Sequence, residues 1–173
     1  MVGLHKKLKE FMSLLSVTVE TTVSVDQTSA FEHIVPIDLT SIFKGYGLLP
    51  SVISTQNQVG AWNTAGQTRT VHLSDKSSVQ ELLTKYDSPR YFSYTVSGFT
   101  SLLRFLVTSA DGEWWFRVGS SDQTNIKWCY TFNARSILAV PLLWLITKVL
   151  WQNYMHQVLQ LSKAQVELQS GME

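Results

Sequence analysis

The sequence predicts an α+β fold in which a curved antiparallel sheet wraps around one long C-terminal helix. Three observations predict it: an alternating strand near the N-terminus, closely spaced hairpin strands in the middle of the chain, and a final apolar stripe at helical spacing. With 173 residues, the chain has the length of a single domain with one continuous core. We therefore expect one domain over 15–168, between an N-terminal segment (1–14) and a short tail (169–173).

The first elements are predicted to be a strand and two short helices. Residues 17–25 alternate valines with mostly polar residues, which is the period of a half-buried strand. Asp26 can cap a short helix over 27–34. A second short helix is expected over 39–43, and a weak strand candidate comes after it at 52–58.

The middle of the chain is predicted to form a series of antiparallel strands, because the connections between them are short. These strands are expected at 67–73, 79–86, 90–96, 113–118 and 124–133. Asp111 and Gly112 form either a turn or a bulge within a longer strand. The final helix is expected over 136–168, with an apolar stripe made of Leu143, Ile146, Leu150, Tyr154, Val158 and Leu161.

Composition excludes several classes of partner and site. The chain has 14 Lys and Arg against 13 Asp and Glu, so its net charge of +1 argues for neither nucleic acid nor an anionic bilayer. Cys129 is the only cysteine, which excludes an intrachain disulfide and fits a reducing compartment such as the cytoplasm. The four histidines show no metal-ligand spacing, so we expect neither a metal nor a cofactor.

Two apolar segments bear on membranes. Leu4, Leu8 and Phe11 fall on one helical stripe, so 1–14 is expected to form a short amphipathic helix. It would pack on the domain, with weak membrane-surface contact as the alternative. The apolar run at 137–151 is shorter than the ~20 residues that span a bilayer, so we expect a buried helix and no transmembrane segment.

Alternation assigns an aromatic concave face to three neighbouring strands. The inward residues are Phe92, Tyr94, Val96, Trp114, Phe116, Val118, Ile126, Trp128, Tyr130 and Phe132. Together with Val71 and with Ile146, Leu150 and Tyr154 of the terminal helix, they would line a pocket of rings with a few polar tips, which is typical of an apolar ligand site. The alternative is that the same rings only fill the core.

Two charged residues lie on the apolar faces of paired strands. Arg69 alternates with Val71, and Glu81 alternates with Val79. With the turn at 75–76, the two charges are near-diagonal partners and can form an inward ion pair, because burying either one alone is costly. The pair is either a structural salt bridge or a ligand anchor, with Arg69 as donor and Glu81 as acceptor. Glu81 is also the only candidate for a catalytic acid or base.

An ordered set of local patterns runs through the chain. It consists of Val23, Val25, Phe31, Gly66, Arg69, Val71, Leu73, Val79, Glu81, Asp87, Pro89, Tyr94, Thr124, Ile126, Trp128, Tyr130 and Phe132. This set resembles the START-like SRPBCC superfamily, most closely its polyketide cyclase/dehydrase-like bacterial branch, over about residues 15–166. The resemblance implies a helix-grip fold, in which a seven-stranded sheet wraps the terminal helix around a cavity for lipids, polyketides or similar ligands.

The resemblance implies that the chain binds a small hydrophobic molecule for transport, storage or sensing. A cyclase or dehydratase acting in the same cavity is the alternative. A protein-interaction domain, whose groove takes a partner helix because side chains fill its cavity, is the second alternative.

Overall fold

The structure is a computed structural model that describes residues 15–170. The elements, in chain order, are β1 (Ser16–Val23), α2 (Gln27–Ile34), α3 (Leu39–Ile42), β2 (Val52–Gln56), β3 (Thr68–Leu73), β4 (Ser78–Asp87), β5 (Tyr91–Ser97), η1 (Leu102–Phe105), β6 (Val107–Val118), β7 (Thr124–Ala134), η2 (Ile137–Ala139), α4 (Val140–Leu145), η3 (Ile146–Trp151) and α5 (Gln152–Ser170). The segment 1–14, expected to be an amphipathic helix, lies outside the described residues.

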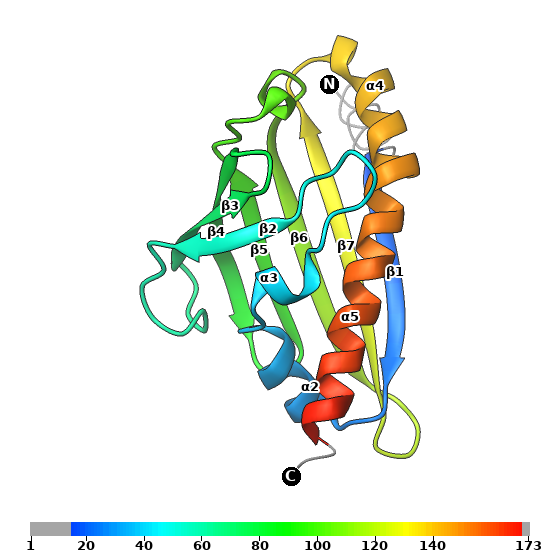
Figure 1. The fold of residues 1–173 in the computed structure, drawn as a ribbon. Coiled ribbons are helices and arrows are strands. Elements are labelled where there is room, and N and C mark those ends of the chain that lie inside the picture. The colour runs from blue at the N-terminus through cyan, green and yellow to red at the C-terminus, as the bar shows by residue number, and fades with distance from the viewer. Residues whose placement is uncertain (1–14, 171–173) are drawn as a thin grey trace, which may run out of the picture.

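The seven strands form one antiparallel sheet in the order β1-β7-β6-β5-β4-β3-β2. The sheet curves around the terminal helix, and α2 and α3 carry the chain from the β1 edge to the β2 edge along the lower end of the concave face (Figure 1). The predicted α+β helix-grip fold is therefore confirmed. The sequence predicts no element at η1, because a single turn is too short for a periodic signal.

The helix α2 begins and is anchored as its sequence indicates. The Asp26 carboxylate accepts hydrogen bonds from the backbone N–H groups of Thr28 and Ser29, at 2.9 and 3.1 Å. The pKa of Asp26 is lowered mainly by the hydrogen bond from the Ser29 side chain and next by the one from the Ser29 backbone. Burial acts in the opposite direction without cancelling these effects. Phe31 on the inner side of α2 is fully buried and meets the ring of Phe116 edge-on, at 5.1 Å between centroids. The cap and the ring together fix α2 against the sheet.

Asp111 and Gly112 lie inside one long strand, β6, and are neither a turn nor a bulge. They pair with Thr95 and Tyr94 of β5, and the register shift of β6 lies nearer its start, between Val107 and Ser109. A Cβ atom at Gly112 would overlap the ring of Tyr94. The glycine therefore gives the Tyr94 ring its place on the concave face.

The concave face carries the rings that strand alternation assigns to it. Every second residue of β5, β6 and β7 is buried over most of their length. The buried aromatic residues are Phe92, Tyr94, Trp114, Phe116, Trp128, Tyr130 and Phe132. Val118, which the same alternation predicts to point inward, is instead 73% exposed, because it ends β6 next to the β6–β7 turn.

The terminal helix buries Leu143, Tyr154 and Val158 as predicted, but between Leu143 and Tyr154 its buried positions are displaced by one residue. The segment η3 is a π-helical turn, which places about one extra residue in the turn and so rotates the rest of the helix about its axis. Ile146 and Leu150, predicted to line the cavity, are therefore only half-buried. Thr147 is fully buried, and Trp151 packs against the rings of β7.

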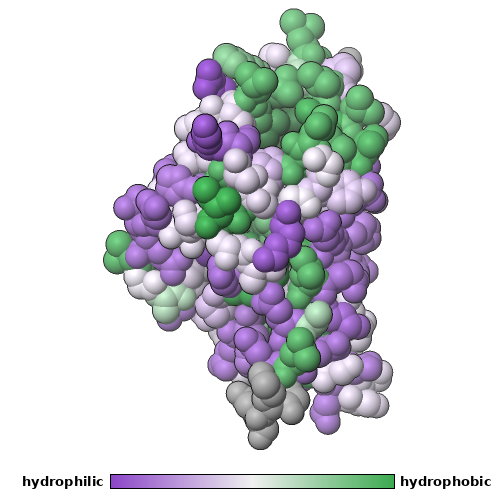
Figure 2. Space-filling view, viewed as in Figure 1, coloured by the Kyte–Doolittle hydropathy of each residue, from purple (hydrophilic) through white to green (hydrophobic). Residues whose placement is uncertain are grey.

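The apolar run 137–151 is not the buried helix that its sequence predicts. Only 28% of the most apolar window in the helix Ile137–Ser170 is buried. In Figure 1, α4 lies at the upper end of the molecule past the ends of the strands, and Figure 2 shows hydrophobic surface gathered there. By length and composition, this helix is the one in the described part of the chain that could cross a membrane. Its lower half, α5, packs against the sheet.

Candidate ligand-binding site

The predicted inward ion pair between Arg69 and Glu81 is present. The two residues are directly opposite each other on β3 and β4, rather than near-diagonal, because the turn takes up residues 74–77. Arg69 Nε donates to Glu81 Oε2 at 2.6 Å, and the two side chains are only 8% and 11% exposed. Pairing offsets part of the cost of burying each charge.

Trp62 covers this pair from the solvent side. It lies in the loop between β2 and β3, and its ring centroid is 4.0 Å from the Arg69 guanidinium carbon. Trp62 is 1% exposed, whereas the other residues of the loop 57–66 are exposed. Sequence reasoning missed Trp62, although a large aromatic residue in a loop rich in Gly, Asn and Gln is a usable signal.

A cavity of about 40 Å³ lies beside the ion pair. Five of the predicted site residues line it: Arg69, Glu81, Phe92, Tyr94 and Trp114. The remaining lining residues were not predicted, and they come mainly from α2, α3 and the segments next to them: Ile34, Val35, Ile37, Leu39, Ile42, Phe43, Trp62 and Ser162. A cavity of this size holds one or two water molecules, whereas sites for drug-sized ligands measure roughly 300–1,000 Å³.

The other predicted site residues on the sheet pack against one another beside this cavity. Val71, Phe116, Trp128, Tyr130 and Phe132 are buried on the concave face. Trp128 stacks on Trp114 at 4.6 Å between ring centroids, and Tyr130 meets Trp151 of the helix at 4.8 Å. Side chains therefore fill most of the space beneath the helix, and the hollow is confined to one corner.

Tyr154, predicted to line the cavity, holds a loop in place instead. Its hydroxyl donates to the backbone oxygen of Pro50 at 3.0 Å and accepts from the N–H of Gly45 at 2.9 Å. Both hydrogen-bonding functions of this hydroxyl are used, so Tyr154 fixes the connection between α3 and β2 against α5.

The hydroxyl of Tyr94 interacts electrostatically with both charges of the ion pair. Burial raises the pKa of Tyr94 most, and the negative charge of Glu81 raises it further. The indole groups of Trp114 and Trp128 and the charge of Arg69 act in the opposite direction without cancelling the rise. Tyr94 is therefore a neutral phenol, able to donate or accept a hydrogen bond.

Three buried indole N–H groups face this interior without a hydrogen-bond acceptor of good geometry among residues 15–170. They belong to Trp114, Trp128 and Trp151. The indoles of Trp114 and Trp128 lower the pKa of Tyr94, yet neither indole N–H has a hydrogen-bond partner of good geometry in the described part of the chain. A buried donor without a partner costs about 1–3 kcal/mol. The interior is thus rich in donors that an acceptor oxygen would satisfy.

The site offers two groups for proton transfer and no metal centre. Within residues 15–170, no three His, Cys, Asp or Glu side chains come together as metal ligands would. Glu81 accepts from Arg69, and Tyr94 is a neutral acid next to it. The arrangement can orient and polarise a carbonyl or carboxylate, and Glu81 can exchange a proton with a bound molecule.

The fold is shared with solved structures of low sequence identity. Norcoclaurine synthase from Thalictrum flavum, in complex with dopamine and hydroxybenzaldehyde, has a TM-score of 0.63 at 11% identity, covering 87% of this chain and 85% of that one. The Zhui aromatase/cyclase from a Streptomyces species has a TM-score of 0.63 at 13% identity, covering 88% and 93%. An uncharacterised protein from Bacillus thuringiensis has a TM-score of 0.59 at 14% identity, covering 87% and 98%.

The sequence comparisons give no further relative. No family model matches the chain, and no curated protein matches it. At these identities the solved structures establish the fold alone.

Proposed function

Because the chain has the helix-grip fold of the START-like SRPBCC superfamily, we propose that it binds a small hydrophobic molecule that carries a hydrogen-bond-accepting oxygen. The binding place is the interior between α5 and strands β3–β7. The observation that carries the proposal is the set of buried donors there: Arg69 and the indole N–H groups of Trp114 and Trp128. A ligand oxygen would satisfy the two indole donors, which lack a hydrogen-bond partner in the described part of the folded chain, and would also accept from Arg69, which already pairs with Glu81.

This proposal requires the interior to open, because the cavity of about 40 Å³ is too small for such a ligand. Trp62 is the natural closing element, since it is the buried residue of an otherwise exposed loop and covers Arg69. Displacement of its ring would join the cavity to the solvent beside the ion pair. The ligand then takes the place of the Trp62 ring over part of the polar corner.

The same interior is compatible with several more specific functions. Transport, storage or sensing needs only the binding step. A cyclase or dehydratase reaction would use Glu81 as the acid or base on a ligand held by Arg69 and Tyr94. A cytoplasmic location is part of the proposal, on the ground that Cys129 is the only cysteine.

One observation favours the competing proposal of a protein-interaction domain. The rings of Trp114, Trp128, Tyr130 and Trp151 fill most of the space beneath the helix. In that proposal the interior is a packed core, and only the surface binds a partner. The two proposals differ in whether the interior admits any ligand at all.

Binding of a defined probe separates them. Prodan is a neutral, apolar naphthalene with a single ketone oxygen, and its emission shifts when it enters an apolar site. We expect saturable binding of one prodan per chain, weakened about threefold to tenfold by Trp114→Phe, which keeps a ring and removes the N–H donor. The matched control is Trp144→Phe, which removes an indole that is 44% exposed and should leave the affinity unchanged.

Native mass spectrometry of the protein purified from a bacterial host adds a second readout, namely a co-purified small molecule. Absence of both saturable prodan binding and a co-purified molecule would overturn the proposal in favour of the packed-core alternative. Equal loss of prodan affinity in Trp114→Phe and Trp144→Phe would also overturn it, because binding would then not depend on the interior donors.

A further inference from the structure

Eight large apolar side chains are exposed together at one end of the molecule. They come from η1 and from the η2–α4–η3 segment, each is between 44% and 88% exposed, and we call them the apolar end: Leu102, Phe105, Ile137, Leu138, Leu142, Trp144, Leu145 and Val149. Figure 2 shows the hydrophobic surface gathered at the top, above a mostly polar surface. An apolar patch of this kind on an otherwise polar protein marks an interaction site.

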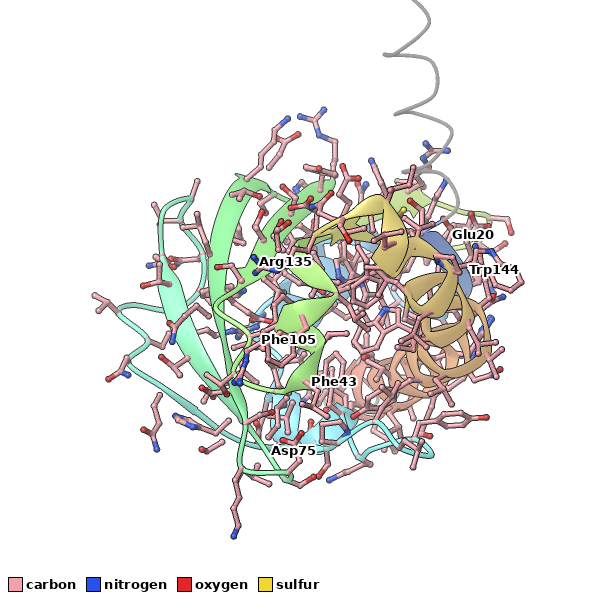
Figure 3. All side chains as sticks on the ribbon, turned by 90° about the horizontal axis from the view of Figure 1, so that it is seen from above. Glu20, Phe43, Asp75, Phe105, Arg135 and Trp144 are labelled. Carbon is pink, nitrogen blue, oxygen red and sulfur yellow. The ribbon has the colours of Figure 1, made fainter. Side chains whose placement is uncertain are left out.

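The two parts of the apolar end are joined through Arg135. Its backbone N–H donates to the Leu106 oxygen, and its Nε donates to the Arg104 oxygen, both at 2.8 Å. Figure 3 looks onto this end and shows Phe105 on one side, Trp144 on the other, and Arg135 close to η1. The patch is therefore one surface built from two chain segments.

Cations, and no carboxylates, accompany these segments. Residues 88–110 and 123–166 contain no Asp or Glu, whereas Arg104, Arg135 and Lys148 lie within them next to the apolar residues. Arg104 and Arg135 are exposed. The sequence is nearly neutral as a whole, but this end of the fold carries only positive charge from its own segments.

Two carboxylates, Asp75 and Glu20, are visible in the view onto the apolar end in Figure 3, but both interact with other parts of the molecule. Asp75 lies in the β3–β4 turn, across the molecule from Trp144 (Figure 3), and it accepts hydrogen bonds from the N–H and hydroxyl of Ser77. Glu20 lies further along β1, directly opposite Lys127 of β7. Neither one neutralises the cations beside the apolar end.

From this arrangement we infer that the apolar end docks the protein on an anionic lipid bilayer. Apolar side chains with an aromatic residue among them, bordered by Arg and Lys, match the boundary between acyl chains and phosphate headgroups. The helix lies at this boundary and does not cross the bilayer. Its exposed part, 137–151, is about 22 Å long, and α5 is held in the sheet.

Charge argues against a second copy of the chain as the occupant. A symmetric dimer through the apolar end would bring Arg104 and Arg135 of both copies together, and like charges repel. The same repulsion acts against the chain's own residues 1–14, whose sequence contains Lys6, Lys7 and Lys9 against a single carboxylate, Glu10. An anionic surface instead attracts all of these cations at once.

The start of β1 also lies near this surface. Lys148 of η3 donates to the backbone oxygen of Ser16 at 2.6 Å, so residue 15 enters the described fold next to the apolar end. This inference does not depend on the proposed ligand site, which lies at the other end of the interior.

Co-sedimentation with large vesicles tests the inference with the full chain. We expect the protein to bind vesicles of an equal mixture of phosphatidylcholine and phosphatidylglycerol, and to bind phosphatidylcholine vesicles more weakly. Leu138→Glu places a charge at a residue that is 88% exposed, so folding should be unaffected while the partition coefficient falls about tenfold or more. The control is Leu168→Glu, at a residue of the same helix that is 68% exposed at the opposite end, and it should bind as the wild type does.

Arg104→Gln tests the charge. It should weaken binding to the mixed vesicles roughly fivefold and leave binding to phosphatidylcholine unchanged. The inference is overturned if the wild type binds neither vesicle, or if Leu138→Glu binds as tightly as the wild type does. A concentration-dependent dimer in sedimentation velocity that Leu138→Glu abolishes would likewise overturn it, because a second copy would then cover the apolar end.

Discussion

The two halves of the terminal helix both carry apolar residues at helical spacing, yet the lower half buries most of them and the upper half leaves most of them exposed. The lower half, α5, buries one side against the sheet through Tyr154, Met155, Val158 and Leu159, and turns polar residues outward. The upper half buries Leu143 and Thr147, and exposes apolar residues on the remaining sides. The comparison shows that an apolar helix is not a buried helix unless other segments arrive to cover it.

Attachment to the sheet does not explain the difference, because both halves are tied to β1. Lys148 in the upper half donates to Ser16 O at 2.6 Å, and Lys163 in the lower half donates to Thr22 O at 2.7 Å. What differs is the cover. The helices α2 and α3 pack beside α5 on the concave face, whereas most of the apolar side chains of α4 remain exposed next to η1.

The largest effect should come from breaking the ion pair in the covered region. Arg69→Ala leaves Glu81 buried without its partner and should lower the free energy of unfolding by about 3–5 kcal/mol, measured by urea denaturation. Replacing both residues by apolar ones, Arg69→Met with Glu81→Leu, should recover most of the loss. Arg104→Ala at the exposed end should change the stability by less than about 0.5 kcal/mol. A cost below that figure for Arg69→Ala would show that the pair is solvated.

The second test compares leucines of the two halves directly. Leu159→Ala removes a side chain that is 1% exposed and should cost about 2–5 kcal/mol, because a cavity remains beneath α5. Leu142→Ala, at a residue that is 52% exposed, should cost less than about 0.5 kcal/mol. Thermal or urea unfolding measures both. Similar costs for the two variants would mean that the upper half is covered in solution.

A smaller loss of stability is expected from a substitution at Gly112, which makes room for the Tyr94 ring. Gly112→Ala introduces a Cβ that overlaps the Tyr94 ring, so the ring must move, at a cost of about 1–3 kcal/mol. The same displacement should reduce prodan binding if Tyr94 borders the ligand. Gly66→Ala is a matched comparison for the added methyl group, since no atom lies within 4 Å of a Cβ there, although its φ of +95° adds backbone strain of its own. Unchanged stability of Gly112→Ala would contradict the tight packing of Tyr94.

The smallest effect at neutral pH is expected for Tyr94→Phe, and it should appear only in alkali. The folded state raises the pKa of Tyr94, so the unfolded chain loses this proton first. The contribution of Tyr94 to stability is therefore fully present below its ordinary pKa of about 10 and is lost as the pH rises above that value. Stability measured across this range should fall less steeply for Tyr94→Phe than for the wild type or for Trp144→Phe. Parallel curves for all three proteins would contradict a buried Tyr94 hydroxyl.

Much of the fold and part of the site could be predicted from local patterns. Alternation along β5, β6 and β7 identified the buried rings, because successive side chains of a strand must point to opposite faces. The same rule placed Arg69 and Glu81 on inward faces, and the cost of burying a single charge made them partners. The helix α2 was predicted to its ends because Asp26 caps it locally.

The sequence alone therefore determined the order of the elements, the inward faces of the strands and the existence of a buried ion pair, all of which depend on near neighbours along the chain. Only the tertiary structure decided how the space was filled: Trp62 over Arg69, Trp151 brought inward by a π turn, and the uncovered face of α4. Backbone geometry sets which way a side chain points. Whether it meets protein, a cavity or the surroundings depends on which distant segments reach it, and no local period records that.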